Sequence, residues 1–372
     1  MANHTEYTEY SADFTRLLAA LPYIFILICI ATLLFNCVVL AAFTKNSNLR
    51  TPFNVYIISL VIANLLQACF DLPFTVYSEL HPSWELGRIG CNFYLYAKWT
   101  FSAAVRNTHS VISLNRIWAL FFPISYRHYH TRSMAIWLCL GSWLYVHIFL
   151  LPGLVMDAQF YRVDDGSCQV NTTSQRAWAL PTQIVLYNSS VFIVGVSYPI
   201  IWLKVRERRK IDARRNTIHT KTNTIEMKTR VGGPISNVTA LASVEGRKSD
   251  RNSNSLSTKK PNQLHGDSDN SDDTEGVQAT NGQDPGGLTE SLKLKKPSQS
   301  FAVLTYLVIG VVFCWTPIMV YYTMAIITDY NNYVHFIIGT LLYNFNSVLD
   351  PIFFTMAMAP LRATIFHFLS PG

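Results

Sequence analysis

The chain has 372 residues, of which 50% are hydrophobic and only 14% are charged, whereas about a quarter of the residues of an ordinary soluble domain are charged. This composition excludes a typical soluble domain and indicates a membrane protein. The formal net charge of +7 does not indicate nucleic acid as a partner, because the excess of basic residues lies in loops between the predicted helices.

Seven stretches are long enough to cross a lipid bilayer as helices, which takes about 20 residues. They cover residues 20–43, 53–77, 91–122, 134–154, 178–203, 300–327 and 333–356. Most of them lack the polar face of a helix at the surface of a soluble protein. The sequence therefore predicts an all-α integral membrane protein with a bundle of seven transmembrane helices.

The predicted helices divide the chain into five parts. These are an N-terminal segment (1–19), helices one to five with their loops (20–210), a long loop (211–296), helices six and seven (297–356) and a tail (357–372). The long loop is rich in Ser, Asn, Asp and Gly, so we expect it to be disordered, with helical extensions at both ends. The tail contains "PLRATIFHFL", which predicts a short amphipathic helix lying on the membrane.

Basic residues gather in alternate loops. One such loop has Lys45 and Arg50, the next has Arg127 and Arg132, and "KVRERRKIDARR" follows the fifth predicted helix directly. The loops at the other end of the helices are acidic or balanced. By the positive-inside rule, the N-terminus is expected outside the cell and the C-terminus in the cytoplasm of a multi-pass plasma-membrane protein. The first helix would then serve as an uncleaved signal anchor.

Two of the seven cysteines, Cys91 and Cys168, lie on the predicted outer side, where an oxidising environment favours a disulfide between them. Sequons at Asn3 and Asn171 predict glycosylation on the same side. No group of residues has metal-ligand spacing or pairs a nucleophile with a base. The sequence therefore predicts neither a metal, a cofactor nor an enzyme.

The third predicted helix contains charged residues at helical spacing. Its polar residues follow one another at intervals of four, four, three, four and three: Lys98, Ser102, Arg106, His109, Ser113 and Arg116. This spacing places them on one face of a helix. Charged groups within a membrane usually face the interior of a bundle, so the third helix is expected at its centre.

Several stretches, taken in chain order, resemble the motifs of rhodopsin-like (class A) G protein-coupled receptors. They are "LLFNCVVLAAF", "LRTPFNVYIISLVIANLL", "WELGRIGC", "NRIWALFFPISYR", "FCWTP" and "NSVLDPIFF". The resemblance covers all seven helices. It implies a receptor that binds an extracellular small molecule or peptide and signals to a heterotrimeric G protein when the cytoplasmic side of the bundle opens.

The resemblance also implies roles for single residues. Those implied in activation or G protein coupling are Asn115, Arg116, Tyr126, Tyr198, Trp315, Pro317, Asp350, Pro351 and Phe354. Arg116 would close the resting bundle and contact the G protein in the open one. The structural alternative is that Arg116 extends only to the lipid headgroups.

The sequence departs from the family pattern at several of these positions. Asn115 stands where the family has an acid, and Phe354 where it has a tyrosine. Asn64 stands where the family has an aspartate, and Asp350 where it has an asparagine. Arg106 occupies a position that is usually apolar. We expect a buried network of these three residues in which Arg106 pairs with Asp350. The alternative partners of Arg106 are backbone carbonyls and water.

The outer cavity is expected to differ from that of amine receptors. Lys98 stands where those receptors have an aspartate, which disfavours a simple cationic amine. Lys98 either pairs with Asp71 or is free to bind a ligand carboxylate. The expected lining is Asp71, Lys98, Ser102, Thr182, Trp315, Met319, Tyr322, Thr340 and Asn344. Asn344 stands where retinal-binding receptors have a lysine, which disfavours photoreception. Apart from Asp71, Lys98 and Trp315, packing between helices explains each residue equally well.

Two other functional classes remain open beside the receptor, and one special case of the receptor itself. Charged residues within helices also occur in channels and transporters, although no inverted repeat is visible here. A membrane enzyme has no catalytic residues in support. A receptor-like protein that does not signal, and acts by pairing with another receptor, is compatible with Asn115 and Phe354.

Overall fold

The structure is a computed structural model that describes residues 12–162, 166, 168–230 and 299–370. The chain divides into two units, Met1–Ile211 with Lys296–Gly372, and Asp212–Lys295. The first unit contains the helix bundle. In the second, the described residues form the last part of helix α8. Most of the predicted disordered loop, and Asn3, lie outside the described residues.

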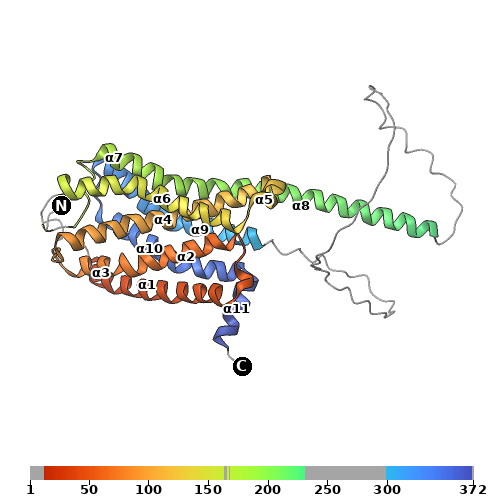
Figure 1. The fold of residues 1–372 in the computed structure, drawn as a ribbon, viewed down its shortest axis with the longest axis horizontal. Helices are drawn as coiled ribbons and strands as arrows, with labels where there is room; N and C mark the ends of the chain where they lie inside the picture. The colour runs from red at the N-terminus through yellow and green to blue at the C-terminus, as the bar shows by residue number, and fades with distance from the viewer. Residues whose placement is uncertain (1–11, 163–165, 167, 231–298, 371–372) are drawn as a thin grey trace, which may run out of the picture. The chain divides into compact units, whose positions relative to one another are not determined.

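The described residues form only helices and turns (Figure 1). In chain order the helices are α1 (Ala12–Lys45), η2 (Ser47–Leu49), α2 (Asn54–Phe70), α3 (Leu72–Leu80), α4 (Gly87–Phe121), α5 (Pro123–Tyr129), α6 (Arg132–Met156), η3 (Asp157–Tyr161), α7 (Arg176–Thr182), η4 (Gln183–Asn188), α8 (Ser189–Arg230), α9 (Gln299–Thr328), α10 (Tyr333–Ala357) and α11 (Ala359–Leu369).

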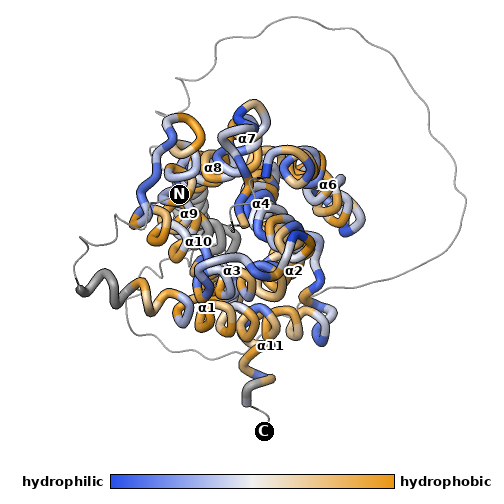
Figure 2. Tube along the Cα trace, turned by 90° about the vertical axis from the view of Figure 1, so that its left-hand side faces the viewer, coloured by the Kyte–Doolittle hydropathy of each residue, from blue (hydrophilic) through white to orange (hydrophobic). Residues whose placement is uncertain are grey.

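Six segments of the described chain are long and apolar enough to cross a membrane: Leu18–Lys45, Asn54–Leu80, Arg132–Tyr161, Arg176–Arg208, Val308–Thr328 and Tyr333–Ala357. Helix α4 is the seventh long helix of the bundle, and its charged residues make it less apolar than those six segments. It lies inside the ring of the other helices (Figure 2). The seven predicted spans thus correspond to the seven helical segments of the bundle.

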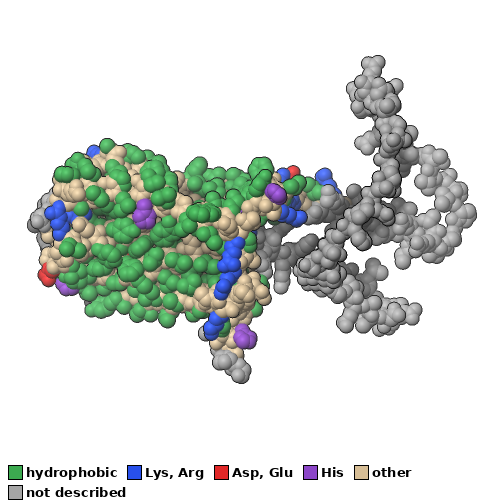
Figure 3. Space-filling view, viewed as in Figure 1, with side chains coloured by type: hydrophobic (Ala, Val, Ile, Leu, Met, Phe, Trp, Pro, Cys, Tyr) green, Lys and Arg blue, Asp and Glu red, His purple; other side chains and the backbone are tan. Residues whose placement is uncertain are grey.

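The predicted polar stripe of α4 faces the bundle interior. Ser102, Arg106, His109 and Ser113 are all buried. The outer surface of the bundle is apolar instead, with exposed residues such as Leu27, Trp137, Leu144, Phe192 and Phe313. On the visible face, Lys, Arg and acidic side chains are confined to the two ends of the bundle (Figure 3). This arrangement is that of a bundle with lipid around it and polar groups within.

The disulfide between Cys91 and Cys168 is present, as predicted, with the two Cα atoms 5.6 Å apart. It joins the first turn of α4 to the segment that follows η3. We call this side of the bundle the disulfide end. The opposite side, where Lys45, Arg50 and Arg127 lie, is the basic end.

Helix α11 begins directly after α10 at the basic end and turns away from it (Figure 1). It confirms the predicted short helix. Leu361 and Ile365 are buried, and α11 contacts α1. Asn46 donates to Thr364 at 3.0 Å, and Lys45 lies 4.5 Å from the centroid of the Phe368 ring. Part of its apolar face therefore packs on the bundle instead of facing lipid.

Two of the transmembrane segments are locally irregular. The second changes from α2 to α3 at Asp71, two residues before Pro73, because a proline has no backbone N–H to continue the hydrogen-bond ladder. The fifth contains the π-helical turn η4. A π turn holds an extra residue and so changes which side chains face inward. Both irregularities lie beside the cavity described next.

Candidate functional site

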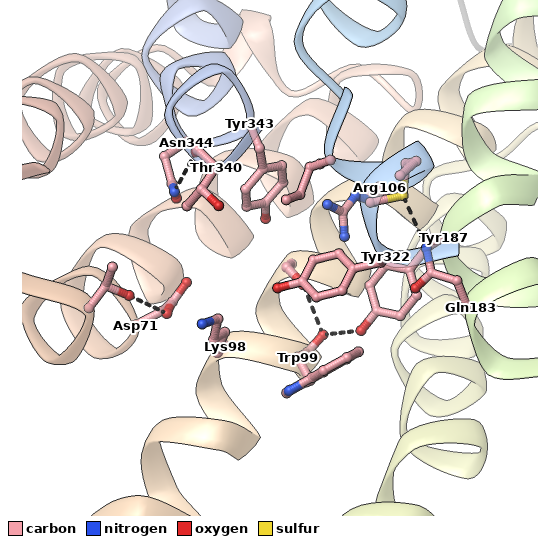
Figure 4. Close-up of a pocket in the computed structure, with 14 residues that line it drawn as sticks. Asp71, Lys98, Trp99, Arg106, Gln183, Tyr187, Tyr322, Thr340, Tyr343 and Asn344 are labelled. Carbon is pink, nitrogen blue, oxygen red and sulfur yellow. Dashed lines mark hydrogen bonds between the residues drawn. The ribbon is translucent and has the colours of Figure 1, made fainter. Parts of the chain in front are cut away.

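A cavity lies between the helices toward the disulfide end of the bundle. Its volume is about 540 Å³, including space that it shares with solvent. Helices α2 to α4, η4, α9 and α10 supply its walls (Figure 4). The lining residues are Asp71, Thr75, Lys98, Trp99, Ser102, Arg106, Gln183, Tyr187, Ile318, Met319, Tyr322, Thr340, Tyr343 and Asn344.

The structure brings most of the expected lining together. The residues that were expected and do line the cavity are Asp71, Lys98, Ser102, Met319, Tyr322, Thr340 and Asn344. Thr182 and Trp315, in contrast, are buried outside its wall. Thr182 precedes the π turn, and that turn presents Gln183 and Tyr187 to the cavity instead. Ligand binding by any of these residues stays a prediction.

Sequence reasoning missed half of the wall. The additional residues are Thr75, Trp99, Arg106, Gln183, Tyr187, Ile318 and Tyr343. Arg106 could have been predicted as a lining residue, because it lies on the polar stripe one turn after Ser102. Gln183 and Tyr187 could not have been predicted, since no residue type marks the π turn in the sequence.

Lys98 and Asp71 both face the cavity. The ion pairs in the described part of the chain do not include one between them. Lys98 Nζ donates to the Tyr94 hydroxyl at 3.1 Å and lies 5.2 Å from the centroid of that ring. Asp71 Oδ1 accepts from the Thr75 hydroxyl at 3.2 Å. Which of the two alternatives holds for Lys98 therefore stays a prediction.

Arg106 lies deeper in the cavity wall, and its contacts are aromatic. Its Cζ lies 4.3 Å from the centroid of the Tyr343 ring, 4.9 Å from that of Tyr187 and 5.7 Å from that of Trp315. Cations are attracted to ring faces. The predicted ion pair with Asp350 is wrong.

His109 takes the place of Arg106 as the partner of Asp350. Asp350 Oδ2 lies 3.1 Å from His109 Nε2 and accepts from Asn64 Nδ2 at 3.2 Å. Its Oδ1 accepts from Asn346 Nδ2 at 3.2 Å. His109 lies three residues after Arg106, about 4.5 Å further along α4, which brings it level with Asp350. The predicted network thus keeps Asn64 and Asp350 but loses Arg106.

At the basic end, Asn115 is part of a second polar cluster. Asn115 Nδ2 donates to the Tyr56 hydroxyl at 3.3 Å, and its Oδ1 accepts from the Tyr126 hydroxyl at 3.2 Å. His130 Nε2 lies 3.2 Å from the same Tyr56 hydroxyl, and its ring stacks on Tyr126 at 4.3 Å. Burial lowers the pKa of His130, and the charge of Arg116 lowers it further.

Arg116 itself is half-buried at this end of α4. Its Cζ lies 3.2 Å from the centroid of the Phe53 ring, at the start of α2. Arg116 therefore lies against the bundle instead of extending fully into the headgroup region.

The remaining expected residues lie as follows. Trp315 is fully buried, with its ring 4.9 Å from that of His109. Pro317 lies inside α9, and its carbonyl accepts from His335 Nε2 at 2.9 Å. Pro351 and Phe354 are buried in α10, and Tyr198 is half-buried in α8.

The sequon residue Asn171 uses its side chain within the loop. Its Nδ2 donates to the Tyr161 carbonyl and its Oδ1 accepts from the backbone N–H of Ser174, both at 3.0 Å. Attachment of a glycan replaces one of the two Nδ2 hydrogens and leaves the other for the bond to Tyr161.

Comparisons with known proteins find a family that matches most of the chain and relatives that match about half of it. Residues 35–354 match the family described as "7 transmembrane receptor (rhodopsin family)". The alpha-2B adrenergic receptor of Talpa europaea is 27% identical over 184 residues, 50% of this chain and 46% of that receptor. Melanopsin-B of Xenopus laevis is 27% identical over 178 residues, 46% of this chain and 33% of its own. The 5-hydroxytryptamine receptor 1B of Didelphis virginiana is 28% identical over 183 residues, 49% of this chain and 46% of its own. The matches thus span less than half the length of each relative.

Proposed function

Because the chain belongs to the rhodopsin family of seven-transmembrane receptors, we propose that it is a G protein-coupled receptor. Its ligand binds in the cavity toward the disulfide end, and a heterotrimeric G protein binds at the basic end. Members of this family are receptors and not enzymes, and the chain is a multi-pass membrane protein.

The observation that carries this proposal is the series of contacts along α4. Arg106 lies in the cavity wall, His109 contacts Asp350 of α10, and Asn115 contacts Tyr56 of α2. One continuous helix therefore connects the cavity to the basic end and contacts a different neighbouring helix at each level. A ligand that favours one arrangement of these contacts would change the basic end as well.

The charges of the loops support one orientation in the membrane. With the basic end in the cytoplasm, as the positive-inside rule requires, the disulfide lies outside the cell, where oxidation is favoured. The N-terminus is then extracellular and the cavity opens toward extracellular ligands. We place the receptor in the plasma membrane on this basis.

The ligand is not a simple cationic amine. Two of the relatives are an adrenergic and a 5-hydroxytryptamine receptor. In this chain, however, Lys98 and Arg106 line the cavity against the single carboxylate of Asp71. Their combined charge repels a protonated amine.

The test is a second-messenger assay in cells that express the chain at their surface, with and without a ligand library. We expect a response in the unmodified chain that Arg116→Ala abolishes at equal surface expression. A matched control is Arg127→Ala, an exposed arginine of the same end, which should keep the response. A chain that is silent to every ligand and without basal output would favour the receptor-like protein that only pairs with another receptor.

A further inference from the structure

Arg106 is a buried cation that no acidic side chain of the described residues neutralises. The residue is 3% exposed, its Nε has no hydrogen-bond partner, and the ion pairs of the described residues do not include it. A guanidinium stays protonated in proteins. A buried charge without a partner carries a large desolvation cost, so an anion at this position would stabilise the folded protein.

The surrounding rings compensate this charge only in part. Tyr187, Trp315 and Tyr343 attract the guanidinium through their ring faces, but a ring face does not replace an oxygen acceptor for the N–H groups. The hydroxyls of Tyr187 and Tyr343 make hydrogen bonds with residues other than Arg106. That of Tyr187 donates to the Trp99 carbonyl at 2.9 Å, and that of Tyr343 accepts from Gln67 at 2.9 Å.

The cavity is where an acceptor for Arg106 can enter. Arg106 is one of its lining residues, and Figure 4 shows its guanidinium beside Tyr343, Tyr187 and Tyr322. Lys98 lies on the same face of α4, two turns and about 12 Å nearer the disulfide end. Together the two cations exceed the one carboxylate of the wall, that of Asp71, by one positive charge.

We propose that this cavity binds a small carboxylic acid, whose carboxylate forms a charge-assisted, forked hydrogen bond with Arg106. The planar guanidinium matches a carboxylate in geometry. The body of the ligand packs against the rings of Trp99 and Tyr322, which are 5.8 Å apart. The cavity volume of about 540 Å³, part of which is shared with solvent, suits a small ligand. This inference rests on the proposed function, since it specifies the ligand of the same site.

Binding can be measured without any signalling readout. The full chain is purified in lipid nanodiscs, and its thermal unfolding is followed with sodium phenylacetate or indole-3-acetate. The matched probes are phenylacetamide and indole-3-acetamide, which lack the charge, and sodium chloride at the same ionic strength. A ligand of the native state raises the unfolding temperature in proportion to its affinity. We expect the acids to bind at least about tenfold more tightly than their amides, as for a hydrogen bond between charged groups.

Variants then locate the charge that selects the acid. Arg106→Gln should remove the preference for acid over amide. Arg127→Gln, the same change at an exposed arginine outside the cavity, should keep it. Arg106→Lys should also keep it at reduced affinity, because a lysine keeps the charge but loses the fork. If Arg106→Gln does not fold, the comparison of acids with amides in the unmodified chain and in Arg106→Lys still tests the inference.

Four results would overturn the inference: equal shifts for acids and amides, no shift with any acid at millimolar concentration, the same shift with chloride, or an acid preference that survives in Arg106→Gln. Equal stabilisation by chloride would mean that the site holds an inorganic anion. None of these results depends on a G protein. A chain that binds acids but does not signal would contradict the proposed function alone, and one that signals without binding acids would contradict only this inference.

Discussion

Asp157 is a buried carboxylate that holds the loop after α6 in place. It is fully buried and accepts from Nε and Nη2 of Arg162 at 2.8 and 2.7 Å. Its other oxygen accepts from the backbone N–H of Asn171 at 2.8 Å and from Gln175 at 3.3 Å. The sequence showed an acid and a nearby arginine in a loop, but not that four donors converge on one carboxylate.

Asp157→Asn should therefore destabilise the protein strongly, since it leaves Arg162 without its counter-charge. Breaking a buried ion pair costs about 3–5 kcal/mol. The control is Asp329→Asn, which breaks the exposed pair with Arg176 and should cost less than about 1 kcal/mol. Thermal unfolding of the purified variants measures both. Equal losses would show that the burial of Asp157 does not matter.

His130 gives the basic end a dependence on pH. Burial is the main cause of its lowered pKa, and the charge of Arg116 is the second. Tyr56, Tyr126 and Trp118 also contact it, and none of them offers a carboxylate. The folded protein therefore favours the neutral imidazole.

The sign of the effect follows from linkage. In the unfolded chain the imidazole titrates near pH 6.5, so below about this pH the unfolded state binds a proton first and stability falls as the pH falls. His130→Gln should reduce this loss between about pH 7 and 5. His128→Gln, which changes an exposed histidine of the adjoining helix α5, should leave the loss in place. Unfolding temperatures across this range provide the measurement, and an unchanged slope in His130→Gln would contradict the assignment.

At the scale of elements, Gly153 sets the distance between α6 and α7. A Cβ added there would lie 1.9 Å from the Trp178 ring. Trp178 Nε1 donates to the Phe149 carbonyl at 2.8 Å, so the ring cannot move away without breaking that bond. Gly153→Ala should cost about 1–3 kcal/mol, as overpacking does.

Gly141 is the matched control in the same helix. A Cβ there meets nothing within 4 Å, so Gly141→Ala should instead stabilise α6 by about 0.5–1 kcal/mol through the better helix propensity of alanine. We expect the two variants to shift the unfolding temperature in opposite directions. A neutral Gly153→Ala would mean that α7 is not held closely against α6.

Some elements could be predicted from the sequence and others could not. Length and apolar composition predicted every helix of the bundle, because a membrane leaves backbone groups few other ways to satisfy their hydrogen bonds. The polar spacing of α4 correctly predicted its buried face. Composition does not reveal a π turn, so the side of η4 that faces the cavity could not be predicted. The spacing along α4 also does not predict whether Arg106 or His109 contacts Asp350. That depends on how far along the bundle Asp350 lies in α10.

At the scale of the whole molecule, Asn115 bears on the balance between closed and open states. It contacts Tyr56 and Tyr126 and carries no charge. Asn115→Asp adds a carboxylate one residue from Arg116, which should favour the closed state that holds the arginine within the bundle. A change of about 1.4 kcal/mol in this balance changes the population ratio tenfold.

We therefore expect Asn115→Asp to lower ligand-independent second-messenger output at equal surface expression. Asn48→Asp is the control, since it adds the same charge at an exposed asparagine of η2 and should leave the output unchanged. A basal output that Asn115→Asp leaves unchanged would remove Asn115 from the account of activation.

The most direct test of signalling uses the purified chain in lipid vesicles with purified heterotrimeric G proteins. Nucleotide exchange on the G protein is measured without ligand, for the unmodified chain, for Arg116→Ala and for empty vesicles. We expect exchange above that of empty vesicles for at least one G protein class, and its loss in Arg116→Ala. Exchange no faster than in empty vesicles for every class, or exchange that Arg116→Ala leaves intact, would contradict this expectation.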